Sequence, residues 1–336
     1  MGRRMKIMRK SLRLKTVLCI LMGVAMLTLS FANGVFASKQ TLEVVSSKAA
    51  PAGLEDPIWE KIKPLTVPFD GKEKFAGAKT SVDTKAVYTD TDVYFLFSWK
   101  DSTFNVTKGA WMYDGSAWTH QKGDEDRISL LFEINRINNF ATKGCAVTCH
   151  VPAGAPNAKE GKFGTLSETE KGDLWHWKAA RSDPAGYADD GYLTKISETK
   201  GGRMGDAGKG GDKRNEIEDK SKPKYMLAPG KQLGKNGILL AVDAVEITDY
   251  STFKAGDMLT YRMPVAAEGS FADIAAVSSY ADGTWTVMLS RKLATGNGDD
   301  VEFNTKKKYS FAMALFDDSS DQDSYDSETL TLEFGR

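Results

Sequence analysis

Apolar and polar residues alternate with a period of two in several short stretches of the chain, as they do in β-strands. In residues 93–99 a large apolar side chain occupies every second position. Asp282-Gly283 is a hairpin turn signal between two further stretches, residues 275–280 and 284–290. Other strands are predicted at residues 86–88, 127–134, 174–178, 237–247, 258–264, 309–316 and 329–334. Many short strands with turn chemistry between them predict a mainly β protein, built as an antiparallel sandwich.

Two stretches interrupt this pattern. Residues 141–172 are rich in Gly, Ala and Lys, and residues 199–236 are dominated by Gly, Lys and Asp. Loops of this length in a compact domain are usually functional or disordered. Both lie between predicted strands, so we expect a single domain, residues 38–336, that carries two long excursions.

The first 37 residues follow a different pattern. Seven basic residues and no acidic residue come first, and residues 17–31 form an uncharged apolar run. Val35-Phe36-Ala37 then places small residues one and three positions before a cleavage point. This order predicts a secretory signal peptide, residues 1–37, and therefore a periplasmic or otherwise exported protein. The alternative is a membrane anchor, but the run is short for a span.

Removal of the signal peptide changes the charge balance. The whole chain has 45 basic and 45 acidic residues, and 45 − 7 = 38 basic residues remain, which gives a net charge of −7. Such a surface favours neither nucleic acid nor an anionic membrane as a partner. It suits a partner with a basic docking patch, and no second run of the sequence is long and apolar enough to span a bilayer.

After removal of the signal peptide, only Cys145 and Cys149 remain, and His150 follows the second cysteine. Covalent haem attachment needs two thiols for the two vinyl groups and an adjacent histidine for the iron, usually as C-x-x-C-H. Here the spacing has one extra residue. The pair could instead form a small disulfide, bind zinc without an evident fourth ligand, or be a coincidence. The export signal and the lack of other cysteines favour one covalent haem c, with His150 as the proximal iron ligand.

The second axial ligand has several candidates. His176 lies between Trp175 and Trp177, and strand alternation sends the two tryptophans and the histidine to opposite faces. Met226 follows a proline near the end of the second excursion, where a thioether could reach a cofactor, and its alternative role is core packing. His120 is expected at the surface. The tryptophans either line a haem pocket or fill the sandwich core.

Several segments together resemble a known family. The chain is similar to the haem-binding family of the ethylbenzene dehydrogenase γ subunit, which includes haem subunits of dimethyl sulfide dehydrogenase and of chlorate and selenate reductases. The Trp-x-Trp-Lys-Ala stretch is the most specific of the matching segments. These segments are residues 56–59, 86–88, 93–101, 126–132, 173–181, 299–301 and 311–314, with Trp285 and Arg291.

The resemblance implies an immunoglobulin-like sandwich, related to DOMON and family 9 carbohydrate-binding modules, that holds haem at one end in long loops. The molybdoenzyme subunits of the family hold a non-covalent haem b between Met and Lys. This chain departs from them by carrying Cys145, Cys149 and His150, as the c-type branch does. The resemblance therefore implies that His150 replaces one ligand, and it favours Met226 over His176 for the other.

The leading functional hypothesis is an exported mono-haem cytochrome that carries electrons and is not itself an enzyme. Its expected partners are redox proteins, among them a molybdoenzyme or a membrane quinol-oxidising complex. One alternative is a haem subunit of a periplasmic molybdoenzyme complex. Another is a non-redox sugar-binding module with exposed Trp111 and Trp118 as its platform.

The sequence offers no other reactive constellation. It contains no nucleophile–base arrangement, no Gly-rich phosphate loop and no evident carboxylate cluster for a metal. The acidic pairs Asp189-Asp190 and Asp317-Asp318 are expected to be solvated turns.

Overall fold

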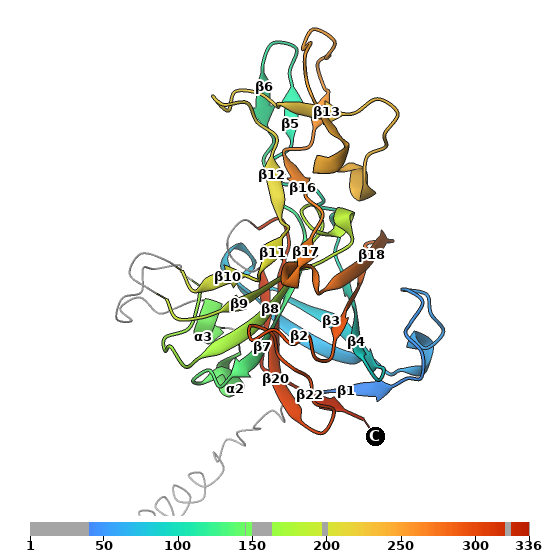
Figure 1. Ribbon diagram of the computed structural model, residues 1–336, viewed down its shortest axis with the longest axis vertical. Helices are drawn as coiled ribbons and strands as arrows, with labels where there is room; N and C mark the ends of the chain where they lie inside the picture. Colours follow the sequence, from blue (N-terminus) through green and yellow to red (C-terminus); the bar gives the residue numbers. More distant parts are fainter. Residues whose placement is uncertain (1–39, 145, 150–162, 197–200, 320–323, 336) are drawn as a thin grey trace, which may run out of the picture. The chain divides into compact units, whose positions relative to one another are not determined.

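Most of the strands that the alternation predicts are present in the computed structural model of the protein (Figure 1). The predicted signal peptide lies outside the residues that the structure describes, as do Cys145 and His150. In the described part of the chain, no helix combines the length and the apolar composition needed to cross a bilayer. The described residues are 40–144, 146–149, 163–196, 201–319 and 324–335.

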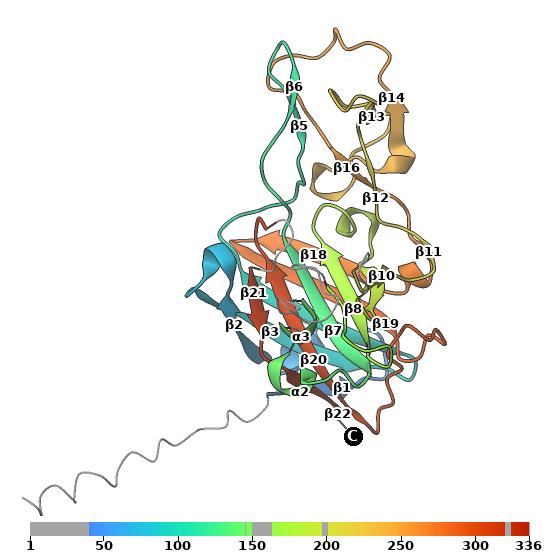
Figure 2. The same cartoon turned by 90° about the vertical axis from the view of Figure 1, so that its left-hand side faces the viewer.

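One large sheet of 13 strands folds over on itself into two layers (Figure 2). Its strands are β1 (Thr41–Ser46), β2 (Leu65–Gly71), β3 (Lys79–Tyr88), β4 (Asp92–Lys100), β7 (Arg127–Asn135), β8 (Lys171–Lys178), β9 (Asp189–Leu193), β10 (Arg203–Gly205), β18 (Ala275–Ala281), β19 (Thr284–Lys292), β20 (Lys308–Phe316), β21 (Tyr325–Ser327) and β22 (Leu330–Phe334). One layer has the order β10-β9-β8-β7-β20, and the other has the order β3-β4-β19-β18. The pairs β21–β2 and β22–β1 join the two layers at one side.

The predicted antiparallel sandwich is confirmed, with one exception. Among the described strands of the large sheet, every pairing is antiparallel except those of β1, which runs parallel to both β22 and β3. Strand β1 lies where the two layers meet. Its parallel pairs with β22 and β3 connect the layers there, and the pairs within each layer remain antiparallel.

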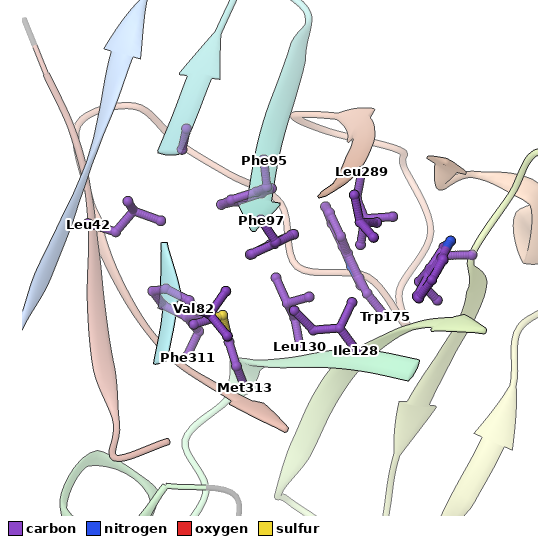
Figure 3. Close-up of a cluster of buried hydrophobic side chains, with 14 of the residues drawn as sticks. Leu42, Val82, Phe95, Phe97, Ile128, Leu130, Trp175, Leu289, Phe311 and Met313 are labelled. Atoms are coloured by element: carbon purple, nitrogen blue, oxygen red, sulfur yellow. The ribbon is translucent and has the colours of Figure 1, made fainter. Parts of the chain in front are cut away.

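The hydrophobic core lies between the two layers (Figure 3). Phe95 and Phe97 of β4 face Leu130 of β7 and Trp175 of β8 from the opposite layer. The rings of Phe95 and Trp175 meet edge to face at 5.7 Å. Each fully buried side chain of this size stabilises the fold by about 1.5–3 kcal/mol. The tryptophans of β8 are therefore part of what holds the two layers together.

A group of small elements extends from one end of the sandwich, towards the top of Figures 1 and 2, and we call it the outlying segment. It contains most of the second predicted excursion, which is built from short paired strands. These are β5 (Trp111–Tyr113), β6 (Trp118–His120), β12 (Asp212–Arg214), β13 (Tyr225–Leu227), β14 (Ala244–Glu246), β15 (Met258–Leu259) and β16 (Arg262–Pro264).

The remaining elements are β11 (Gly208–Lys209), β17 (Glu268–Gly269), α2 (Phe140–Lys143), α3 (Ala146–Cys149) and the 3-10 helices η1 (Trp59–Lys61), η2 (Glu73–Phe75), η3 (Asp183–Ala185), η4 (Lys235–Gly237), η5 (Ala241–Asp243) and η6 (Ser270–Ala272).

The predicted strand at residues 237–247 is wrong except at its end. The chain there forms η4, η5 and only the three residues of β14. Asn236 and Gly237 adopt left-handed backbone angles, with φ of 60° and 73°, which no strand tolerates. Ile238 and Leu239 are nevertheless buried, whereas Val242 is 79% exposed, so only part of the apolar pattern is packed.

The predicted strand at residues 258–264 is divided into β15 and β16. Between them, the carbonyl groups of Thr260 and Tyr261 accept hydrogen bonds from Asn215, at 2.9 Å from its Nδ2 and 2.7 Å from its backbone nitrogen. These backbone groups are therefore not available for a continuous ladder. The Asn215 side chain also accepts hydrogen bonds from the backbone of Lys224 and Tyr225, which ties the outlying segment together.

The acidic pair Asp189-Asp190 is not a solvated turn. Asp190 is fully buried on β9 beside Arg291, whose Nη1 lies 3.4 Å from Asp190, 2.8 Å from Asp173 and 3.1 Å from Asp300. Arg291 is itself buried. One guanidinium thus supplies the counter-charge for three buried carboxylates, which would otherwise be very costly to bury.

Asp206 lies at the margin of this acidic group, and its titration should be visible in the stability of the protein. Burial, together with Asp299 and Asp300, raises the pKa of Asp206 to about 7. Because this value lies above the unfolded value of about 3.9, the folded state binds more protons between these two values. The contribution of Asp206 to stability is therefore present at low pH and is lost as pH rises through about 7.

We predict that Asp206→Asn removes this loss. Relative to wild type, the variant should gain stability as pH rises from about 4 to 7, by up to about 1.4 kcal/mol per pH unit. Urea unfolding at several pH values measures the difference, with Asp90→Asn, at an exposed position, as control. A difference between Asp206→Asn and wild type that does not change with pH would contradict the expectation.

Candidate functional site

The candidate site lies on the side of the β10-β9-β8-β7-β20 layer that faces away from the core. Trp175 and Trp177 of β8 are buried in the core, so strand alternation directs Leu174, His176 and Lys178 to the opposite side. We call this side the outer face. By strand register it comprises Ser129, Leu131, Leu174, His176, Lys178, Asp189, Gly191, Arg203, Gly205, Ala312 and Ala314.

The short helix α3 packs on the outer face. Val147 of α3 contacts a cluster of apolar residues that includes Leu131, Leu174 and Leu193. The carbonyl oxygen of Thr148 accepts a hydrogen bond from the backbone nitrogen of Gly164 at 2.9 Å. These contacts fix α3 against β7, β8 and β9.

This packing places the backbone of α3 on the same face of the sheet as His176. Cys149 is the last residue of α3, and Cys145 and His150 adjoin the helix in sequence but lie outside the described residues. Leu174 belongs to the cluster that holds α3. His176 is two residues further along the same side of β8, a step of about 7 Å.

His176 has an unusual hydrogen-bonding state. Its side chain is buried, and Nη2 of Arg203 lies 2.7 Å from its Nδ1. Arginine can only donate, so Nδ1 accepts, and the neutral ring must carry its proton on Nε2. Nε2 is buried and has no hydrogen-bond partner among the described residues. A buried polar atom without a partner is rare and calls for an explanation.

The surroundings of His176 keep the ring neutral. Burial is the main cause that holds the pKa of His176 well below its usual value, and the charges of Arg203, Lys178, Arg127 and Arg181 lower it further. A neutral imidazole is the form that binds a metal ion or donates a single N–H.

The charges around His176 are organised in pairs and stacks. Lys178 forms an ion pair with Asp189, and Arg181 forms one with Glu125. The Arg127 guanidinium lies 4.2 Å from the centre of the Phe316 ring. The charged side chains of this region include Lys108, Arg127, Lys178, Arg181 and Arg203, with Asp124, Glu125, Asp189 and Asp212 as their acidic neighbours. Cationic groups are thus available beside His176.

Glycines line a hollow on the outer face. A hollow of about 360 Å³ lies over β9 and β10, and its lining includes Gly191, Gly205, Arg203 and Phe271. A Cβ atom at position 191 would lie 2.5 Å from the carbonyl oxygen of Met204, so only glycine fits there. The hollow beside Leu174 could accept one side of a planar ring.

Trp175 and Trp177, predicted as pocket or core residues, have no exposed surface and lie in the core. The Nε1 of Trp177 donates a hydrogen bond to Asp183 at 2.9 Å. Both side chains are on the opposite side of the sheet from His176. Their contribution to the outer face is to fix the direction of β8.

The structure does not bring Met226 to α3. Met226 lies in β13, which pairs with β14 in the outlying segment, and it is opposite Val245. Figures 1 and 2 both show β13 at the far end of that segment, away from α3. The Pro-containing segment, which was expected to bring Met226 to the haem, therefore lies in the outlying segment and away from α3.

His120, Trp111 and Trp118 also belong to the outlying segment. The ring of His120 stacks on Trp111 at 3.6 Å, and its Nδ1 is 2.7 Å from the carbonyl oxygen of Gly109. Trp111 and Trp118 are only 2% and 9% exposed. They do not form the exposed aromatic platform expected of a sugar-binding module.

Sequence reasoning missed Arg203, which contacts His176 from 27 residues away. Arg203 lies in a Gly-rich stretch without apolar alternation, so no local signal identifies β10 as a strand. Its register with β9, which pairs Arg203 with Leu193, is what carries the guanidinium to the outer face.

The outer face could hold a planar cofactor that has a metal at its centre and acidic groups at its edge, as haem does. The orphaned Nε2 of His176 could meet the metal, and the neighbouring cations could meet the acidic groups. Ligation through Nε2 requires the ring proton to be on Nδ1 instead. Arg203 would then have to release Nδ1, and its guanidinium could turn to an acidic group.

Comparison with known proteins gives one family and several distant folds. A family model described as ethylbenzene dehydrogenase matches residues 56–328. No curated protein matches the chain. Two solved structures have a related architecture. A family 9 carbohydrate-binding module from Caldicellulosiruptor kristjanssonii, solved with glucose, is 8% identical, with a TM-score of 0.37 over 88% of this chain and 96% of that chain. A protein from Bacteroides uniformis described as carbohydrate-binding is 10% identical, with a TM-score of 0.39 over 89% of this chain and 100% of that chain.

Proposed function

This chain belongs to the ethylbenzene dehydrogenase family, and we propose that it is an exported mono-haem c-type cytochrome that passes electrons between redox partners. The observation that carries the proposal is the Nε2 of His176, which is buried, lies on the same face as α3 and has no partner within the described ranges of the chain. Redox chemistry is what the haem supplies when bound, and the chain's own residues bind, orient and shield it.

In this proposal Cys145 and Cys149 form the two thioether bonds and His150 is the proximal ligand. The support is the motif itself, in which two thiols and an adjacent histidine stand in a chain with no other cysteine after residue 37. The packing of Val147 on the cluster that includes Leu131 supports the helix that ends at Cys149.

We assign the distal position to His176 and not to Met226. His176 is buried on the outer face, two residues from Leu174, whereas Met226 is in the outlying segment. The neutral state of His176 suits ligation. Arg203 and its neighbouring cations are assigned to the haem propionates, because carboxylates form their strongest hydrogen bonds with cationic donors.

The proposed partners are redox proteins. With residues 1–37 removed, the chain has a net charge of −7, which favours a partner with a basic docking surface. Family membership also favours a place beside a molybdoenzyme, where the same haem site would connect a catalytic subunit to an electron acceptor. A membrane quinol-oxidising complex is the alternative donor. Co-purification of the native protein with a large catalytic subunit distinguishes the complex from the free carrier.

We predict that the protein carries one covalent haem when it is produced in a host with c-type maturation machinery. The intact mass should exceed that of residues 38–336 by one haem, and the Soret band should survive acid–acetone extraction. Replacing Cys145 and Cys149 together with Ser should make any bound haem extractable. A wild-type protein of the mature mass without haem, produced in that host, would sink the proposal.

We predict a bis-histidine iron. His176→Ala should convert the ferric protein from low spin to high spin and open the iron to cyanide, since it removes the distal ligand. Met226→Ala is the matched control and should leave the spectrum unchanged. Wild-type ferric protein should lack the weak band near 700 nm that is typical of methionine ligation. The presence of this band and its loss in Met226→Ala would assign the ligand to Met226 instead.

A further inference from the structure

Three aspartates from distant parts of the chain meet where three strands end. Asp101 follows β4, Asp126 precedes β7, and Asp317 follows β20. One carboxylate oxygen from each lies within 4.8 Å of the other two. Asp101 and Asp126 are buried, and Asp317 is half-buried in the bend that follows β20.

Asp126, a member of this group, has one unsatisfied carboxylate oxygen. Its Oδ2 accepts hydrogen bonds from the backbone nitrogen of Asn105 and from Nε1 of Trp285, both at 3.0 Å. Its Oδ1 is buried without any hydrogen-bond partner among the described residues, and the side chain has no exposed surface. A buried carboxylate with one oxygen in this state is destabilising unless the carboxyl is protonated or a cation contacts that oxygen.

Thr103 adds a second sign of missing positive charge. Its Oγ1 lies 3.0 Å from Oδ1 of Asp101, 2.6 Å from Oδ1 of Asn105 and 3.5 Å from Oδ1 of Asp317. A hydroxyl group has one hydrogen, so it can donate to only one of these three oxygens. The four oxygens share this proton and the backbone N–H of Thr103, which donates to Oδ1 of Asp101 at 3.0 Å.

The group of Arg291 shows how the same fold treats a similar cluster. There, three buried aspartates share one guanidinium at 2.8–3.4 Å. At Asp101, Asp126 and Asp317, by contrast, no described lysine, arginine or histidine forms an ion pair with any of the three. The nearby Lys74 donates to the carbonyl oxygen of Asp318 and pairs with its carboxylate at 3.8 Å.

The lack of a counter-charge has an electrostatic consequence. Burial raises the pKa of Asp126 to about 8, and the neighbouring Asp101 contributes to the shift. The negative charge of Asp126 is therefore costly in this poorly hydrated place, and a bound cation would offset that cost.

We propose that Asp101, Asp126 and Asp317, together with Thr103 and Asn105, form a binding site for one Ca²⁺ ion. All five side chains offer oxygen, which is the ligand atom that Ca²⁺ takes, whereas zinc sites use nitrogen and sulfur. Oxygens on opposite sides of Ca²⁺ are about 5 Å apart, and the three carboxylates fit within that span. Mg²⁺ needs a smaller, near-octahedral shell that this mixed set of side chains does not resemble.

The site would join the ends of β4, β7 and β20 next to the outer face. Arg127 directly follows Asp126 and donates a hydrogen bond to the carbonyl oxygen of Ser319, two residues after Asp317. Asp318 accepts a hydrogen bond from the backbone nitrogen of Asp124 at 2.6 Å. Bound Ca²⁺ would therefore stabilise the turn that supports Arg127. The Ca²⁺ proposal does not depend on haem binding.

The test uses the full mature chain after dialysis against a chelator. Titration calorimetry with CaCl₂ should give a stoichiometry of one, and excess CaCl₂ should raise Tm by several degrees, while MgCl₂ at the same concentration should have a much smaller effect. Asp317→Asn, at a half-buried turn, should weaken Ca²⁺ binding at least tenfold. Asp126→Asn should do the same and keep its acceptor for Trp285.

Asp300→Asn is the matched control, because it removes one carboxylate from the cluster that Arg291 already satisfies. It should lower Tm but keep the wild-type response to Ca²⁺. The proposal is overturned if wild type shows neither heat of binding nor a change in Tm with CaCl₂. It is also overturned if Asp317→Asn and Asp126→Asn both bind Ca²⁺ as tightly as wild type.

Discussion

The alternation of side chains along β8 is the constraint on which the arrangement of the outer face depends. Trp175 packs edge to face on Phe95 at 5.7 Å, and Trp177 packs on Trp285 at 5.1 Å, so both rings are held between the two layers. Neither can turn outward without emptying the core, which would cost about 3–5 kcal/mol for one such side chain. His176, which lies between them, must therefore face outward, and its position is as well defined as that of the core.

A rigid strand can hold a polar side chain in a buried position even where one of its hydrogen-bonding atoms has no partner. The ring of His176 is buried with one nitrogen satisfied by Arg203 and the other without a partner. Elsewhere, Arg291 offsets part of the charge of three buried aspartates. Several buried polar atoms of the described residues have no hydrogen-bond partner, and Nε2 of His176 and Oδ1 of Asp126 are the two to which we assign ligands. In each case the missing partner is a group that the polypeptide itself does not contain.

The sequence predicts what depends on local pattern. The alternation at residues 93–99, the Asp282-Gly283 hairpin and the opposite orientation of His176 and its two tryptophans are all present in the fold. Residues 237–247 have the composition of a strand, but the chain there forms η4, η5 and the short β14, because Asn236 and Gly237 adopt left-handed backbone angles.

Features made by distant contacts could not be predicted. Arg203 reaches His176 through the register of β10 with β9, and Asp317 meets Asp101 across more than half of the chain. In both cases the residues carry no local signal, because turn-like sequences rich in Gly and Asp are typical of solvated loops. The sequence analysis favoured Met226 over His176 as the second axial ligand, and here too the position of the residue depends on a distant contact. The segment that holds it packs with β14 and not with the sandwich.

The central claim is that a haem occupies the outer face beside His176. Pseudocontact shifts measure this directly, as the difference in amide resonances between the ferric low-spin and the ferrous diamagnetic forms of deuterated, ¹⁵N-labelled protein. The account predicts the largest shifts in residues 174–178 and 189–193, with residues 225–227 almost unaffected. Largest shifts in residues 225–227, with β8 and β9 unaffected, would contradict it and place the haem at the outlying segment.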